Sequence, residues 1–175
     1  MRERTWWKEA VVYQIYPKSF SDSDGDGFGD LPGVIERLDH LERLGVDCVW
    51  LNPVYESPQR DNGYDVSDYR AIYPEFGTMD DWDRLLDELH ERDIRLVMDM
   101  VPNHTSTDHE WFQRSRSDPD GEYGDYYIWR DGDTDANGDP VPPNNWESFF
   151  GGSAWEYDDE REAWYLHLYD VSQPD

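Results

Sequence analysis

The stretch that decides the fold is Ile94-Arg95-Leu96-Val97-Met98-Asp99-Met100-Val101. It is almost continuously apolar and Pro102 follows it, which predicts a buried strand. Two runs of the same kind precede it, at residues 11–16 and 47–52. Strands that are apolar on both faces are typical of parallel sheets covered by helices, so the three runs predict an α/β fold.

Two amphipathic helices are predicted between these strands. The first ends at Gly45, and the second begins at Thr78, a suitable N-cap with Asp81 three residues later. Their apolar faces consist of Val34, Ile35, Leu38, Leu41 and Leu44 in the first helix and of Trp82, Leu85, Leu86 and Leu89 in the second. The resulting order is strand, helix, strand, helix, strand.

The chain changes in character after Pro102. Residues 105–175 contain five of the nine tryptophans, many Asp and Gly residues, and little helical periodicity. Within them, Trp164-Tyr165-Leu166-His167-Leu168-Tyr169 is typical of a strand. The sequence therefore predicts a first domain at residues 1–104 and an irregular, strand-poor insertion at residues 105–175, after the third strand.

The composition is strongly acidic. The 175 residues carry 41 acidic and 15 basic side chains, a net charge of −26, and the only lysines are Lys8 and Lys18. Such a charge repels nucleic acids and anionic membranes, so neither is an expected partner. Two interpretations remain: an ordinary acidic protein, or adaptation to molar salt, which the scarcity of lysine and the Asp residues on helix exteriors favour.

The cellular location of the protein and the redox state of its cysteine are predicted from features that the sequence does not contain. No apolar run approaches the roughly 18 residues of a membrane span, and residues 1–7 contain no apolar signal-peptide core, which predicts a cytoplasmic location. Cys48 is the single cysteine, so no intrachain disulfide forms. Its apolar neighbours predict a buried structural thiol.

A metal site is predicted in the loop after the first strand, Asp22-Ser23-Asp24-Gly25-Asp26-Gly27-Phe28-Gly29-Asp30. Its carboxylates occupy positions one, three, five and nine, Gly27 allows a sharp turn at position six, and Phe28 supplies a carbonyl. Position twelve is Gly33 instead of the Glu of an EF-hand. We expect a structural Ca²⁺ here, with Mg²⁺ as second choice; the alternative is a solvated acidic turn.

Polar residues at strand ends form the candidate site. Asp99 and His104 lie at the carboxyl end of the third strand, where parallel α/β folds place their sites. A carboxylate within an apolar strand requires a partner, and no Arg or Lys nearby in sequence is an obvious candidate. The loop after the second strand contains Asp61 and Tyr64, and an aromatic ring beside a carboxylate suits a sugar; the alternative is a turn with a packing tyrosine.

Taken in order, these segments resemble the α-amylase superfamily of glycoside hydrolases, in its α-glucosidase and oligo-1,6-glucosidase branch. The resemblance extends over essentially the whole chain. It is carried by Trp6 to Pro17, Asp22 to Leu31, Asp61-Asn62-Gly63-Tyr64-Asp65, Phe76 to Asp81, Asp99 to Ser106, Asp125 to Trp129, Pro143 to Trp146, Gly152 to Trp155 and Gln173-Pro174-Asp175. It implies a (β/α)₈ TIM barrel, of which this chain holds the first three βα units, with a domain inserted after the third strand.

The resemblance also implies residue roles. Asp61, Tyr64 and His104 would line the pocket for a non-reducing terminal glucose, and Phe150, Tyr169 and Gln173 would complete its wall. Tyr169 stands where relatives often have Phe. Asp99 would support the site by pairing with an arginine outside these 175 residues. The metal ligands would be Asp22, Asp24, Asp26, Asp30 and the Phe28 carbonyl.

The implied activity is retaining hydrolysis of short α-glucosides, oligosaccharides or disaccharides, by two carboxylates. The resemblance implies that the nucleophilic carboxylate follows a fourth strand and that the acid/base carboxylate follows a fifth. None of the catalytic carboxylates is therefore expected among these residues. We therefore expect the 175-residue piece to be inactive by itself. Two alternatives stay open: a transglycosylating relative that forms trehalose or trehalulose, and a non-catalytic sugar-binding or partner subunit. Linkage preference and oligomeric state are also open.

Overall fold

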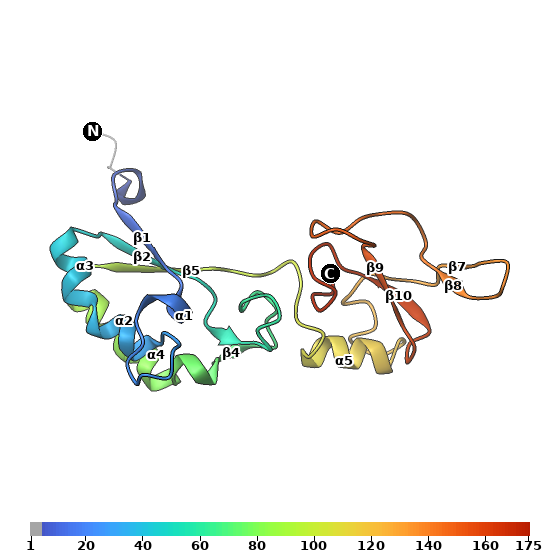
Figure 1. Cartoon of the computed structure of the whole chain (residues 1–175), viewed down its shortest axis with the longest axis horizontal. Helices are drawn as coiled ribbons and strands as arrows, with labels where there is room; N and C mark the ends of the chain where they lie inside the picture. Colours follow the sequence, from blue (N-terminus) through green and yellow to red (C-terminus); the bar gives the residue numbers. More distant parts are fainter. Residues whose placement is uncertain (1–4) are drawn as a thin grey trace. The chain divides into compact units, whose positions relative to one another are not determined.

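The three apolar runs form a parallel sheet in the order β1-β2-β5 (Figure 1). Its strands are β1 (Val12–Ile15), β2 (Cys48–Leu51) and β5 (Arg95–Met98) in a computed structural model that describes residues 5–175. Val12 is paired with Cys48, which in turn is paired with Arg95. The α/β prediction is confirmed. Cys48 is a free, buried thiol, and burial raises its pKa.

The first predicted helix is two helices, α2 (Leu31–Glu36) and α3 (Leu38–Leu44). Arg37 separates them with a backbone ψ of 1°, outside the helical range. The predicted apolar face is otherwise retained, because Val34, Leu38 and Leu41 are fully buried. The interruption could not be seen in the apolar spacing, which continues through it. As predicted, the second of these helices ends at Gly45, in the left-handed conformation.

Helix α4 (Met79–Glu91) begins as the sequence predicts. Thr78 Oγ1 accepts a hydrogen bond from the Asp81 backbone N–H, and the Asp81 carboxylate accepts one from the Thr78 N–H. Leu85 and Leu89 are fully buried in the same core cluster as Val49 and Leu51 of β2. The short elements of this part of the chain are a 3₁₀ helix η1 (Trp6–Lys8), α1 (Pro17–Phe20), β3 (Tyr55–Glu56), β4 (Asp68–Ile72), which pairs with β3, and a 3₁₀ helix η2 (Pro74–Phe76).

The segment after residue 104 contains more regular structure than its sequence pattern indicates. It holds helix α5 (Glu110–Ser117), an antiparallel sheet in the order β6-β10-β9, and a hairpin of β7 and β8. The strands are β6 (Trp129–Arg130), β7 (Asp133–Thr134), β8 (Pro140–Val141), β9 (Trp155–Asp158) and β10 (Ala163–Leu166). The predicted strand at residues 164–169 ends at Leu166. Phe112 of α5 packs on Trp129 and Tyr165, so distant aromatic contacts stabilise these elements.

The chain divides into two compact units. Among the described residues, the first unit contains residues 5–56 together with Arg70–Met100, and the second contains Ser57–Tyr69 together with Val101–Asp175. The sequence places the division after residue 104; the structure places it after Met100 and adds the loop 57–69 to the second unit. Among residues 5–175, no helix has the length and apolar character needed to cross a bilayer.

Candidate functional site

All six residues predicted to contact glucose belong to the second unit, and contacts link them. Gln173 Nε2 donates to Asp61 Oδ2 at 2.9 Å, although 112 positions separate these residues. His104 Nε2 lies 3.1 Å from the Tyr64 carbonyl oxygen. A carbonyl only accepts hydrogen bonds, so Nε2 is the donor in this contact. The structure therefore brings the Asp61 loop, the His104 segment and the C-terminal segment together.

Aromatic rings form the other side of this cluster. The Tyr169 ring lies 5.3 Å from the His104 ring and 5.9 Å from the Phe150 ring, measured between centroids. Phe149, which sequence reasoning did not single out, packs on Tyr169 at 5.3 Å. Phe149 and Phe150 are mostly exposed, and so are available to a ligand. We call Asp61, Tyr64, His104, Phe150, Tyr169 and Gln173 the sugar cluster.

The backbone around His104 is anchored by Tyr69. The Tyr69 hydroxyl lies within hydrogen-bonding distance of two carbonyl oxygens, 2.6 Å from that of Val101 and 3.0 Å from that of His104. Asn103 Nδ2 donates to the Asp175 carboxylate, which also accepts from the Leu168 N–H. Burial raises the pKa of Asp175, and these donors oppose that effect. The sequence pattern offered no sign of these pairings.

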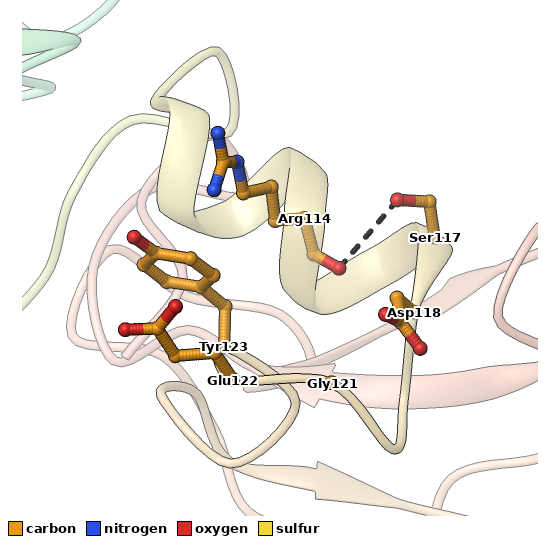
Figure 2. A pocket seen from close by; sticks show the side chains of 6 residues that line it. All are labelled: Arg114, Ser117, Asp118, Gly121, Glu122 and Tyr123. Atoms are coloured by element: carbon orange, nitrogen blue, oxygen red, sulfur yellow. Dashed lines mark hydrogen bonds between the residues drawn. The ribbon is translucent and has the colours of Figure 1, made fainter.

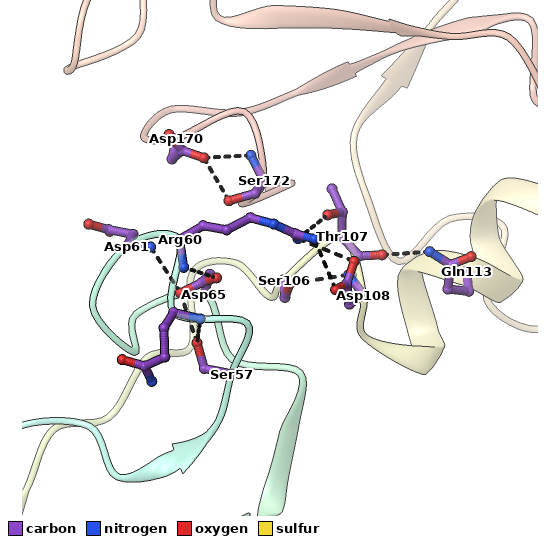
Figure 3. Close-up of polar contacts among 11 residues, drawn as sticks. Ser57, Arg60, Asp61, Asp65, Ser106, Thr107, Asp108, Gln113, Asp170 and Ser172 are labelled. Atoms are coloured by element: carbon purple, nitrogen blue, oxygen red, sulfur yellow. Dashed lines mark hydrogen bonds and ion pairs between the residues drawn. The ribbon is translucent and has the colours of Figure 1, made fainter. Parts of the chain in front are cut away.

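The loop that carries Asp61 is held by side-chain contacts that the sequence did not predict (Figure 3). Both guanidinium nitrogens Nη1 and Nη2 of Arg60 donate to the Asp108 carboxylate, at 3.2 and 3.1 Å, and Nη1 also donates to Thr107 Oγ1. The buried Asp65 accepts hydrogen bonds from inside the loop. Burial raises the pKa of Asp61, whereas the Gln173 hydrogen bond lowers it.

Asp99 lies in the first unit, next to the end of β5. Its Oδ1 accepts a hydrogen bond of 2.6 Å from Trp50 Nε1, and its backbone N–H donates to the Leu51 carbonyl. The sequence predicted a partner for this carboxylate, and one partner found is the neutral indole of Trp50. Asp99 is half-buried, so it requires less compensation than a fully buried carboxylate. Its pairing with an arginine elsewhere stays a prediction.

Three of the four predicted metal-binding carboxylates converge. Oxygens of Asp22, Asp24 and Asp30 all lie within 4.8 Å of one another. Asp26 is outside this group, and its carboxylate accepts from the Phe28 N–H at 2.7 Å. Hydrogen bonds from the N–H groups of Gly25 and Gly27 lower the pKa of Asp22. Three converging carboxylates are a ligand set that fits a hard cation.

Asp30 and Gly33 explain why this loop departs from an EF-hand. Asp30 is the N-cap of α2, and its Oδ1 accepts from the Gly33 N–H at 2.5 Å. A Cβ on Gly33 would lie 2.0 Å from the Ser21 carbonyl oxygen. The glutamate of an EF-hand therefore does not fit at this position, and the ligands must come from the front of the loop.

A shallow cavity of about 170 Å³ lies beside the C-terminal end of α5 (Figure 2). Arg114 packs over the Tyr123 ring at 5.1 Å and forms an ion pair with Glu110. The cavity is smaller than the roughly 300–1,000 Å³ of ordinary ligand pockets. None of the sugar cluster lines it, and we assign it no function.

Comparison with known proteins identifies consistent relatives. The α-amylase catalytic-domain family matches residues 14–175. The chain is 62% identical to an oligo-1,6-glucosidase of Parageobacillus thermoglucosidasius over 173 residues, covering 99% of this chain and 30% of the relative. It is 55% identical to an α-glucosidase of Candida albicans, covering all of this chain and 31% of the relative. The chain thus spans about a third of the length of these relatives.

Solved structures give the same result. An isomaltulose synthase mutant from Erwinia rhapontici in complex with sucrose superposes with a TM-score of 0.94 at 54% identity, covering all of this chain and 30% of that one. A trehalose-6-phosphate hydrolase from Bacillus licheniformis gives a TM-score of 0.91 at 56% identity, covering 98% of this chain and 30% of that one.

Proposed function

Because the chain belongs to the α-amylase catalytic-domain family, we propose that it supplies the glucose-binding side of an α-glucosidase-type active site. The observation that carries this proposal is the hydrogen bond between Gln173 and Asp61, beside the His104 and Tyr169 rings. In this arrangement the Asp61 carboxylate would accept hydrogen bonds from glucose hydroxyls. The Phe150 and Tyr169 rings would pack against the C–H groups of the sugar.

The reaction that this site would serve is retaining hydrolysis of short α-glucosides from the non-reducing end. Binding energy at the terminal glucose would orient the scissile bond towards the two carboxylates of the double displacement. From the resemblance, we expect these carboxylates after a fourth and a fifth barrel strand. The parallel sheet described here contains three strands. We therefore expect no turnover by the 175-residue chain on its own.

Transglycosylation is the second candidate. The similarity to an isomaltulose synthase, whose structure was solved with sucrose, favours it. The greater identity to an oligo-1,6-glucosidase, 62% against 54%, supports hydrolysis as the first choice. Trehalulose- and isomaltulose-forming relatives would use the same glucose-binding side, so the sugar cluster serves both proposals. A non-catalytic sugar-binding subunit has no observation in its favour.

We also propose a structural Ca²⁺, with Mg²⁺ as second choice, held by Asp22, Asp24 and Asp30. The convergence of their oxygens supports this site. A cation would neutralise repulsion among the three carboxylates and fix the loop to the start of α2. Two further proposals rest on the sequence alone, namely a cytoplasmic location and adaptation to molar salt.

A chimera tests the proposed function. This chain would replace the aligned 173 residues of the Parageobacillus oligo-1,6-glucosidase. We expect the chimera to hydrolyse isomaltose, and Asp61→Asn to lower kcat/KM by about tenfold or more, since a charged acceptor is lost. Asp133→Asn, an exposed position on β7, is the matched control and should have no effect. A fully active Asp61→Asn chimera would overturn the proposal.

A further inference from the structure

Asp65 is a completely buried carboxylate in the loop that carries Asp61. Three neutral groups donate hydrogen bonds to it (Figure 3). Its Oδ1 accepts from Ser57 Oγ at 2.8 Å and from the Asp61 N–H at 3.1 Å, and its Oδ2 accepts from the Arg60 N–H at 2.9 Å. The sequence placed Asp65 at the end of a motif without giving it a role.

The loop needs this anchor because its backbone is strained. Gln59 and Asn62 have positive φ angles of 61° and 53°, which non-glycine residues adopt at a cost. Between them lie Arg60 and Asp61, whose backbone N–H groups donate hydrogen bonds to the Asp65 carboxylate. An ionised carboxylate bonds more strongly to such donors than a neutral group does, and the bonds offset the cost of burying it.

We propose that Asp65 is a positioning residue for Asp61, and that it acts through the Asp61 N–H to hold the Asp61 side chain in the sugar cluster. This inference rests on the proposed function, because it assumes that Asp61 binds glucose. Arg60 anchors the loop further. Its backbone N–H donates a hydrogen bond to Asp65, and its guanidinium group donates one to Asp108. Asp65 thus ties the Asp61 backbone to Ser57 and Arg60 within the loop, and the Arg60 guanidinium group connects the loop to Asp108.

Asp65→Asn is the informative substitution. It is nearly isosteric, but its amide group can donate where the loop requires an acceptor. Either the Arg60 N–H or the Asp61 N–H would then face another donor, because a backbone N–H, unlike the Ser57 hydroxyl, cannot turn to accept. The matched control is Ser57→Ala, which removes the hydroxyl donor to Asp65 and the acceptor of the Gln59 N–H but leaves both backbone contacts of Asp65 in place. A second control is Thr78→Ala, which removes the α4 N-cap in the first unit and lowers stability without touching the loop.

The experiment uses the 175-residue chain and two measurements. Amide hydrogen exchange measures how well the Arg60 and Asp61 N–H groups are protected from solvent. A saturation-transfer NMR titration with D-glucose measures the affinity of the chain for glucose. We expect Asp65→Asn to accelerate exchange at these two amides by about tenfold or more and to weaken glucose binding by about the same factor. Ser57→Ala and Thr78→Ala should change glucose affinity by less than about twofold.

The two measurements separate the two proposals. If the unmodified chain binds no glucose, the proposed function fails in this chain, while hydrogen exchange still tests Asp65. Asp65→Asn with unchanged exchange at Arg60 and Asp61 would overturn the inference, and so would equal acceleration across both units, which indicates a merely structural role. If Asp65→Asn does not fold, hydrogen exchange in the unmodified chain tests the inference instead. Exchange at the Arg60 and Asp61 amides as fast as in an unstructured peptide would overturn the inference, and protection would support it.

Discussion

Gln173 Nε2 donates a hydrogen bond of 2.9 Å to Asp61 Oδ2. Gln173 is fully buried, so its amide is held in place to meet this carboxylate. The contact has an electrostatic consequence, because burial raises the pKa of Asp61 and the Gln173 amide lowers it. Gln173, a residue far away in the sequence, therefore favours the ionised form of the carboxylate that would accept hydrogen bonds from glucose hydroxyls.

Replacing Gln173 with Ala should raise the pKa of Asp61 further, because burial then acts without its main opposing donor. A raised folded-state pKa means that Asp61 contributes most to stability below its unfolded value, near 3.9, and that this contribution is lost as pH rises through the folded-state value. Carbon-13 NMR titration of the Asp61 carboxyl measures the shift. Gln113→Ala, which loses a bond to the Thr107 carbonyl, is the control. An unchanged Asp61 titration in Gln173→Ala would contradict this prediction.

Calcium should stabilise the chain through Asp24 and not through Asp26. Asp24→Asn removes one of three converging carboxylates, whereas Asp26→Asn changes a carboxylate outside the group. We expect added Ca²⁺ to raise the Tm of the unmodified chain and of Asp26→Asn, and to have a smaller effect on Asp24→Asn, whose amide oxygen can still coordinate but carries no charge. Thermal unfolding with and without chelator measures this. Equal responses of the two variants would show that the predicted ligand set is wrong.

Molar KCl should stabilise the protein. At a net charge of −26, repulsion among the acidic side chains opposes folding in dilute buffer, and salt screens it. We expect the free energy of unfolding to rise by about 2 kcal/mol or more between 0.1 and 3 M KCl, in denaturant titrations. The triple variant Asp80→Asn, Asp83→Asn, Asp87→Asn on α4 should respond less. A free energy of unfolding that does not change with salt would contradict adaptation to molar salt and support the interpretation as an ordinary acidic protein.

Tyr127 should make the second unit sensitive to alkali. Burial raises the pKa of its phenol to about 12, and its hydroxyl lies 2.6 Å from Thr105 Oγ1. Its contribution to stability is present below its unfolded pKa, near 10, and is lost as pH rises through about 12. Tyr127→Phe should flatten this part of the stability profile and cost about 1 kcal/mol at neutral pH through the lost hydrogen bond. Burial also raises the pKa of Tyr165, so part of the alkaline loss should remain; a loss of the same size in Tyr127→Phe as in the unmodified chain would refute the assignment.

Local patterns predicted the first unit well. The strands are nearly continuous apolar runs and the α4 N-cap at Thr78 is a local interaction, so each can be recognised without knowledge of distant residues. The interruption at Arg37 was missed because a change in one backbone angle leaves the apolar spacing intact. Helix α5 was missed because Phe112 gains its packing partners from residues that are distant in the sequence.

By itself, the sequence determined the α/β class, the order of the first strands and helices, the family, and the residues worth testing as a site. These properties depend on residue spacing and on motifs. Only the tertiary structure decided which groups meet: Gln173 with Asp61, Trp50 with Asp99, Arg60 with Asp108, and Asp22 and Asp24 with Asp30 but not Asp26. Hydrogen bonds and ion pairs act over a few ångströms, and a chain that folds back on itself sets those distances independently of separation in sequence.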